Sequence, residues 1–223
     1  MTTDELPALK LLHVAADLCQ LAVPCRDAVS DSDTAYKSLL AREEDLASWP
    51  SLLTPSYDFH RVPASASQHS YLGHYDAYSN DVVASAWNRY RCLRILINAL
   101  LLQYSLPYGT LLDGHSSTVR MQQQQQQMST IHALAEEVCC SMAYFLDGPD
   151  RVRSQGPANE VETITAYGST TLGPLLFCVE QEWVPSRMRQ WARHQIEMVK
   201  RATRMDGELL GNGSDTPIVR SCG

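Results

Sequence analysis

The sequence lacks the signatures of several large classes of protein. Its longest apolar run, Ile95 to Leu102, is interrupted by Asn98 and falls well below the ~20 residues of a membrane-spanning helix. The chain begins with polar and acidic residues, and the apolar run from Leu11 to Val14 is too short for a secretory signal. We therefore expect no membrane partner and a protein of the nucleus or cytoplasm that is not secreted.

Cysteine is too scarce to form a disulfide scaffold. The 223 residues contain seven cysteines, an odd number. No two are separated by two residues, a spacing common among zinc ligands. Adjacent Cys139 and Cys140 could form a redox or metal pair, but their helical surroundings favour small, buried apolar side chains. We expect no metal and no cofactor.

Motifs of well-known reactions are also missing. The sequence contains no Gly-x-Ser-x-Gly, no glycine-rich phosphate loop and no His-Glu-x-x-His. Its net charge of -7 gives no whole-surface attraction to nucleic acid, so no direct DNA binding is expected. The one concentrated basic element, Arg187 to Met205, also contains Glu197. A solvated helix face explains it best, with a nucleic-acid or membrane-surface role as the alternative.

What the sequence does contain is the spacing of apolar residues that is typical of helices. It has hardly any of the strict alternation of apolar and polar residues that is typical of strands. Pro50 to Gln68 is rich in proline and serine, which predicts an irregular connector. The fold class predicted is all-α, a single bundle of about six to eight helices in a domain over residues 1–205, followed by a disordered tail over 206–223. The expected helices are Leu6 to Val23, Thr34 to Ala47, 81–104, Met128 to Phe145, Val161 to Glu180 with a kink at Gly173-Pro174, and Arg187 to Met205.

The helix over about 81–104 is the expected centre of the bundle. Apolar residues recur along it at steps of three and four, and from Leu93 onward almost every face is apolar. Asn80 or Asp81 is its predicted N-cap. The six glutamines Gln122 to Gln127 are read as the exposed, frayed first turns of the next helix.

A cluster of histidine, aspartate and tyrosine precedes this central helix. His74 and Asp76 at such density could form an acid–base pair or part of a metal site. The simpler interpretation is an aromatic plug that packs under the central helix. The other members of the cluster are His69, Tyr71, Tyr75 and Tyr78.

Polar residues on a helix that must be buried need partners, because an unpaired buried polar group costs about 1–3 kcal/mol. Arg91 and its neighbours Arg89 and Arg94 could hold an anionic ligand, but ion pairs with Glu136, Glu137, Glu180 or Glu182 are favoured. If a ligand binds beside this helix, the candidate contacts are Tyr71, Tyr75, Tyr78, Trp87, Asn88, Tyr90 and Asn98.

Several segments, taken in order, resemble the C-terminal part of the fungal-specific transcription factor domain, which follows the Zn2Cys6 cluster in many fungal regulators. The resemblance covers roughly Thr34 to Met205. Within it, the run Trp87-Asn88-Arg89-Tyr90-Arg91, followed by Arg94-Ile95-Leu96, matches the family's tryptophan–asparagine–x–tyrosine–arginine core. Each segment is degenerate alone, and the specificity lies in their order and spacing. The other segments are Trp49 to Pro55 with Tyr57, Glu136 to Leu146, Gly173 to Phe177, and Arg189-Gln190-Trp191.

The resemblance implies a helical domain with regulatory, ligand-sensing or dimerising roles. The chain departs from the family in lacking the six-cysteine DNA-binding cluster and the N-terminal half of the helical domain. In addition, Glu180-Gln181-Glu182 stands where the family usually has small residues. A domain of this kind would act through a protein partner, a homodimer or a small apolar ligand, with the regulation of fungal secondary metabolism as a plausible setting.

A second hypothesis makes the same helical domain an enzyme. It would be a cofactor-independent isomerase, dehydratase or cyclase of a fungal biosynthetic pathway. His74, Asp76 and Arg91 would then be its acid–base or anion-holding groups, in a pocket beside the central helix that is lined by tyrosines.

Overall fold

A computed structural model of the chain describes residues 9–16, 32–63, 69–105, 114–147, 173–178 and 180–203. These residues are mostly helical, with one small hairpin, so the predicted all-α class is confirmed. The predicted helix over Leu6 to Val23 is seen over residues 9–16. The tail over 206–223 and most of the helix expected from Val161 lie outside the described residues.

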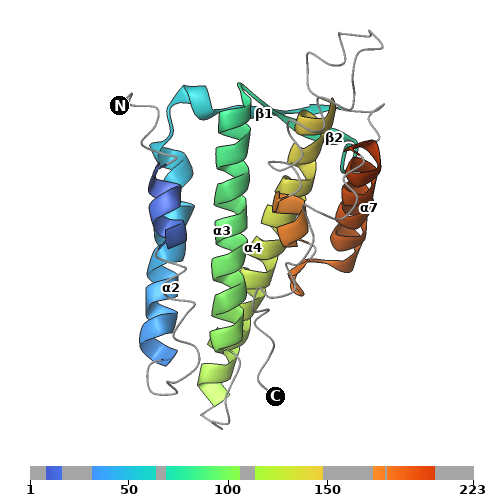
Figure 1. The fold of residues 1–223 in the computed structure, drawn as a ribbon. Helices are drawn as coiled ribbons and strands as arrows, with labels where there is room; N and C mark the ends of the chain where they lie inside the picture. Colours follow the sequence, from blue (N-terminus) through green and yellow to red (C-terminus); the bar gives the residue numbers. More distant parts are fainter. Residues whose placement is uncertain are drawn as a thin grey trace.

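Helix α3, Asp81–Ser105, is the central element of the fold. Its N-cap is Asn80, whose Oδ1 accepts a hydrogen bond from the Val83 amide at 3.0 Å. Helices α2 (Ser32–Ala47) and α4 (Gly114–Asp147) flank it along its length (Figure 1). Side chains on several faces are buried, Ile95 and Ile97 among them, as the near-continuous apolar sequence predicts.

Aromatic rings join the end of α2 to the first turns of α3. A short 3-10 helix, Trp49–Leu52, follows α2 and turns the Trp49 ring inward. This ring stacks on Tyr90 with 5.0 Å between centroids and meets the Trp87 ring edge-on at 5.3 Å. A second 3-10 turn, Pro55–Tyr57, places its last carbonyl 2.8 Å from the Trp87 indole nitrogen, which donates to it.

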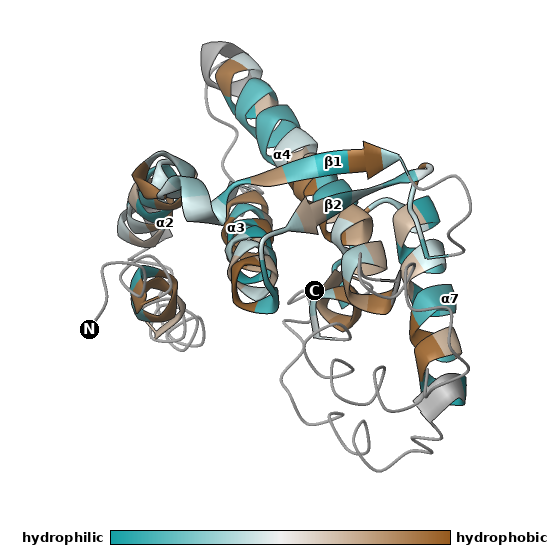
Figure 2. Ribbon diagram, turned by 90° about the horizontal axis from the view of Figure 1, so that it is seen from above, coloured by the Kyte–Doolittle hydropathy of each residue, from teal (hydrophilic) through white to brown (hydrophobic). Residues whose placement is uncertain are grey.

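Helix α4 begins earlier than the sequence predicts. The glutamines 122–127 were expected to be frayed first turns, but they lie inside the helix, because the helix starts at Gly114. Gln124 donates from Nε2 to the Ser105 hydroxyl at 3.2 Å, and Gln127 is buried. Glutamine is a good helix former, so the run continues the helix. The first turns of α4 extend beyond the end of α3 (Figures 1 and 2).

A two-stranded antiparallel hairpin crosses one end of the helices (Figure 2). Strand β1 is Phe59–Pro63 and strand β2 is His74–Tyr78, with Phe59 opposite Tyr78. The prediction of an irregular connector over 50–68 is therefore wrong for β1. Each strand has five residues, too few for a clear alternation, and prolines conceal the first one.

Helix α7, Ser186–Thr203, follows Pro185 and lies beside α4 on the outer side of the bundle (Figure 1). Its inner face is anchored to the segment before β2. The Trp191 ring meets the Tyr71 ring edge-on at 5.1 Å, and Gln195 Oε1 lies 2.7 Å from His69 Nδ1. No helix in the described ranges has the length and apolar character needed to cross a membrane.

Candidate functional site

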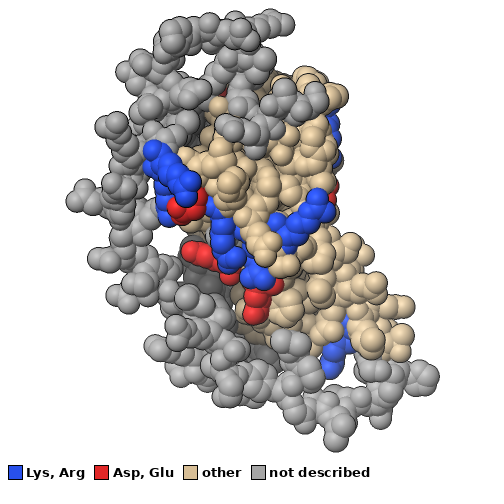
Figure 3. Space-filling view, turned by 90° about the vertical axis from the view of Figure 1, so that its right-hand side faces the viewer, with Lys and Arg blue, Asp and Glu red and all other residues tan. Residues whose placement is uncertain are grey.

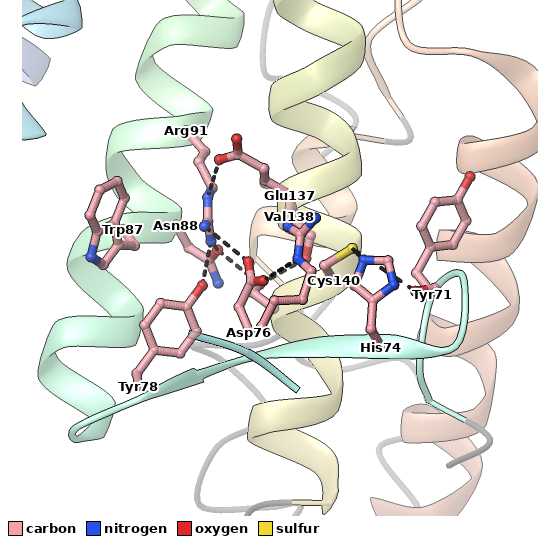
Figure 4. Close-up of polar contacts among 12 residues, drawn as sticks. Tyr71, His74, Asp76, Tyr78, Trp87, Asn88, Arg91, Glu137, Val138 and Cys140 are labelled. Atoms are coloured by element: carbon pink, nitrogen blue, oxygen red, sulfur yellow. Dashed lines mark hydrogen bonds and ion pairs between the residues drawn. The ribbon is translucent and has the colours of Figure 1, made fainter. Parts of the chain in front are cut away.

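Strand β2 and helix α3 bring the predicted residues Asp76 and Arg91 together. Arg91 Nη2 donates to Asp76 Oδ2 at 3.2 Å, and both side chains are fully buried. Nη1 donates to the Tyr78 hydroxyl at 2.5 Å and to Asn88 Oδ1 at 3.2 Å. Figure 4 shows Asp76 and Tyr78 rising from the hairpin toward these two side chains of α3. We call this group the Asp76–Arg91 centre.

The remaining face of the Arg91 guanidinium is closed by α4 and by aromatic rings. Its Nε donates to Glu137 Oε2 at 2.9 Å. The guanidinium carbon lies 5.2 Å from the Phe59 ring centroid and 5.6 Å from that of Trp87, within cation–π range. The guanidinium therefore binds the hairpin, its own helix and α4 at one point.

The Asp76 carboxylate is shared between two arginines. Its second oxygen, Oδ1, accepts a hydrogen bond at 3.0 Å from Nε of Arg61, which is directly opposite in the strand register. Arg61 is 45% exposed, whereas Asp76 and Arg91 are 0% exposed. Both oxygens of this carboxylate are therefore occupied by guanidinium groups of the chain itself.

Burial and charge act in opposite directions on the ionisable groups of the centre. Burial disfavours the Arg91 charge, but Tyr78, Glu137 and Asp76 outweigh it and raise the Arg91 pKa above its ordinary value. Burial raises the pKa of the Tyr78 hydroxyl, although Arg91 opposes this shift. The centre thus holds a fixed cation and a neutral phenol.

Asn88 links the centre to α4. Its Oδ1 lies 2.9 Å from the Ser141 hydroxyl, which is also 2.7 Å from the Val138 carbonyl of α4. The amide nitrogen of Asn88 is buried and has no hydrogen-bond partner. Among the polar groups of the centre, this amide nitrogen is the one left unsatisfied.

His74 lies apart from Asp76 and contacts a cysteine instead. Its Nδ1 is 3.2 Å from the Leu72 carbonyl, so Nδ1 is the donor and Nε2 is free to accept. Nε2 lies 3.4 Å from Cys140 Sγ (Figure 4). The cysteine side chain is completely buried. Burial, followed by the nearby Asp76 charge, raises the pKa of the Cys140 thiol to about 12, so it is protonated at neutral pH.

Two predicted contacts lie away from this centre. The Tyr90 hydroxyl accepts a hydrogen bond from Arg94 Nη1 at 2.9 Å, on the side of α3 that faces α2. The Asn98 amide donates to the Arg94 carbonyl of its own helix at 2.9 Å. Arg94 forms its ion pair with Glu43 of α2, not with the glutamates of α4 or of residues 180–182 as expected. The Arg91–Glu137 pair was among those expected and is confirmed.

Other predicted residues have packing positions. Tyr71 is buried against Trp191, Trp87 is buried against the aromatic rings around it, and Tyr75 is half-buried on β2. Sequence reasoning missed Arg61 and the His74 contact of Cys140, because both depend on the unrecognised hairpin. Within the described residues, no group of three His, Cys, Asp or Glu side chains is arranged to hold a metal ion.

Comparisons with known proteins returned nothing for this chain: no protein-family model, no curated protein and no solved structure matches it.

Proposed function

We propose that this chain is a non-enzymatic, regulator-like helical domain of the fungal-specific transcription factor kind. It acts in the nucleus or cytoplasm through a protein partner, which includes a second copy, or through a small apolar ligand. The regulation of a fungal secondary-metabolite pathway is the proposed setting.

The closed Asp76–Arg91 centre is the observation that carries this proposal. Arg91 directs its donors to Asp76, Tyr78, Asn88 and Glu137, all within the chain. A catalytic or anion-holding arginine needs donors aimed at a substrate, and general acid–base work needs a carboxylate that can exchange protons. Here the charges neutralise each other inside the protein, which favours a structural centre.

The residues that carry the family resemblance have a common use in the fold. Trp87 and Tyr90 pack in the aromatic cluster with Trp49, whereas Asn88 and Arg91 form the polar centre with the hairpin and α4. The four buried members of this motif thus support packing, as a scaffold for binding requires, and Arg89 alone among the five is exposed. This shared use in packing supports the proposed relation to the fungal-specific transcription factor domain, and the support does not depend on any single residue.

Deletion of the gene in its own organism tests the proposal. We expect the transcripts of a biosynthetic pathway to fall together and to recover when the wild-type gene is returned. Intact transcripts with a stalled intermediate would contradict regulation and indicate catalysis. A His74→Gln gene is the matched control, because His74 is only half-buried and the proposal gives it no chemical task. It should restore both transcripts and product.

A cofactor-independent isomerase, dehydratase or cyclase is the second candidate. The contact of 3.4 Å between His74 Nε2 and Cys140 Sγ favours it, since a base beside a thiol can act in proton transfer. Against it stand the complete burial of Cys140 and the raised pKa of its thiol. In this case the His74→Gln strain would keep its transcripts and lose the product.

A further inference from the structure

Helix α7 presents an exposed polar stripe on its outer side. Arg187, Gln190, His194, Glu197 and Arg201 follow one another at steps of three and four residues, and all five are exposed. Such steps place side chains on one face of a helix. We call these five residues the α7 stripe. It is about 21 Å long at ~1.5 Å per residue.

The opposite face of α7 is firmly packed, so the stripe is displayed on a fixed support. Ala192, Ile196 and Val199 are buried, and Gln195 is buried against His69. Trp191 packs on Tyr71. A face held in this way loses little conformational freedom when a partner binds to it.

Positive charge is concentrated here in a chain that is acidic overall. The described part of α7 carries five basic residues, Arg187, Arg189, Arg193, Lys200 and Arg201, against the single acid Glu197. The chain as a whole has a net charge of -7. Figure 3 looks at the side of the molecule on which α7 lies and shows Lys and Arg side chains there, with acidic ones between them.

The exposed arginines of this helix have no internal task. Within the described part of the chain, Arg187, Arg193 and Arg201 form no hydrogen bond or ion pair, whereas Lys200 Nζ pairs with Glu197 at 3.2 Å. The other arginines of the helical core, Arg91 and Arg94, are bound by carboxylates. Arg187, Arg193 and Arg201 are therefore available to a partner.

We propose that the α7 stripe docks a helical segment of a partner protein that carries acidic side chains at seven-residue intervals. Arg187, His194 and Arg201 are seven residues apart, about 10.5 Å per step along the helix. An adjacent partner helix repeats its own side chains at the same interval, so carboxylates on it meet all three positions. This proposal rests on the proposed partner-binding function and names its surface.

The charge pattern favours such a helix over nucleic acid. Glu197 lies inside the stripe, and Glu180 and Glu182 are exposed just before α7. A continuous phosphate backbone would meet these carboxylates as well as the arginines, and the net charge of the chain would repel it. A protein helix, by contrast, can carry both kinds of charge, with a lysine opposite Glu197 and acidic side chains opposite the arginines.

Synthetic peptides test the proposal on the full chain. The probe is a helical peptide about three heptads long with Glu at every seventh position, and its control has the same composition in scrambled order. A random-sequence DNA duplex is the third ligand. We expect the matched peptide to bind about tenfold more tightly than the scrambled one at low salt, and to lose this advantage at high salt.

Charge reversal locates the binding surface. Arg187→Glu combined with Arg201→Glu should abolish the preference for the matched peptide, whereas Arg89→Glu, on the exposed side of α3, should leave it unchanged. Equal binding of the two peptides, an unchanged preference in the double variant, or tighter binding of the duplex would overturn the proposal. The gene of the double variant can also be returned to the deletion strain. If it restores the lost transcripts, the proposed regulatory function stands and only the docking role of the α7 stripe fails.

Discussion

Asp76 of β2 and Arg91 of α3 face each other across the junction of hairpin and helix, with 3.2 Å between Oδ2 and Nη2 and neither side chain exposed to solvent. Because α4 adds Glu137 to the same guanidinium, one buried charge connects three elements. A buried pair of this kind need not stabilise the fold more than apolar residues would, but the loss of one member leaves an uncompensated charge.

Asp76→Asn should therefore destabilise the protein strongly. We expect the free energy of unfolding to fall by about 3–5 kcal/mol, since Arg91 would lose its fully buried carboxylate and keep only the partly exposed Glu137. Urea denaturation followed by circular dichroism measures it. Arg61→Gln is the matched control, because Arg61 is 45% exposed and its ion pair is worth less than about 1 kcal/mol. Similar losses in the two variants would show that burial of the pair does not matter.

Trp87→Ala tests the aromatic cluster beside the centre. The indole is 9% exposed, contacts the rings of Trp49 and Phe59, and donates to the Tyr57 carbonyl. Its removal should cost about 3–5 kcal/mol. Arg89→Ala, an exposed site on the same helix, should change stability by less than about 0.5 kcal/mol. A Trp87→Ala melting temperature close to that of wild type would refute its place in the core.

The tight turn between Tyr71 and His74 holds a leucine in an unfavourable conformation. Leu72 has a φ of 59° and the following Gly73 has a φ of 75°. A left-handed backbone costs a residue with a side chain about 1–2 kcal/mol, and glycine avoids this cost. Leu72→Gly should therefore leave stability unchanged or raise it by up to about 1 kcal/mol.

A β-branched residue at the same place is the matched comparison for that variant. Leu72→Val should lower the melting temperature, because branching at Cβ makes the left-handed region still less favourable. If glycine proved more damaging than valine, the exposed leucine side chain would have a role that the turn geometry does not explain.

The thiol of Cys140 should resist alkylation in the folded protein. It is buried, and its pKa is raised to about 12 from an ordinary value of 9.0. Iodoacetamide at pH 8, with peptide mapping by mass spectrometry, should label Cys140 only after denaturant is added. Rapid labelling of the native protein would mean that His74 activates the thiol, and would favour the enzymatic candidate.

The same raised pKa predicts how stability changes with pH. The folded protein keeps the Cys140 proton between pH 9 and 12, where the unfolded chain releases it, so unfolding becomes easier as pH rises through this window. Below pH 9 the thiol is protonated in both states, and its contribution to the free energy of unfolding is fully present. In urea titrations, stability should fall more steeply above pH 9 for the wild type than for Cys140→Ala. Equal slopes would contradict the burial of this thiol.

The helices were predictable because their signals are local. The spacing of apolar residues placed the central helix over 81–104, and the structure has it over Asp81–Ser105. The basic helix expected from Arg187 likewise begins at Ser186. By contrast, the hairpin has two five-residue strands separated by ten residues, and no local pattern of that length distinguishes a strand from a loop.

The site was only partly predictable for the same reason. His74, Asp76 and Arg91 were the right residues to examine, because buried polar groups need partners. Their actual pairing, Asp76 with Arg91 and His74 with Cys140, depends on the strand register and on contacts between residues up to 66 positions apart. The Asn98 amide donates to its own helix, a contact that sequence spacing allows but does not require, so Asn98 does not join the Asp76–Arg91 centre.

The central claim is that the buried pair of Asp76 and Arg91 holds the fold together. A double-mutant cycle of Asp76→Asn and Arg91→Gln, measured by urea denaturation, tests it most directly. We predict a coupling free energy of at least about 2 kcal/mol, as for a buried pair on which the surrounding elements depend. A coupling below about 0.5 kcal/mol would contradict the claim, because it would show that the fold does not require the pair.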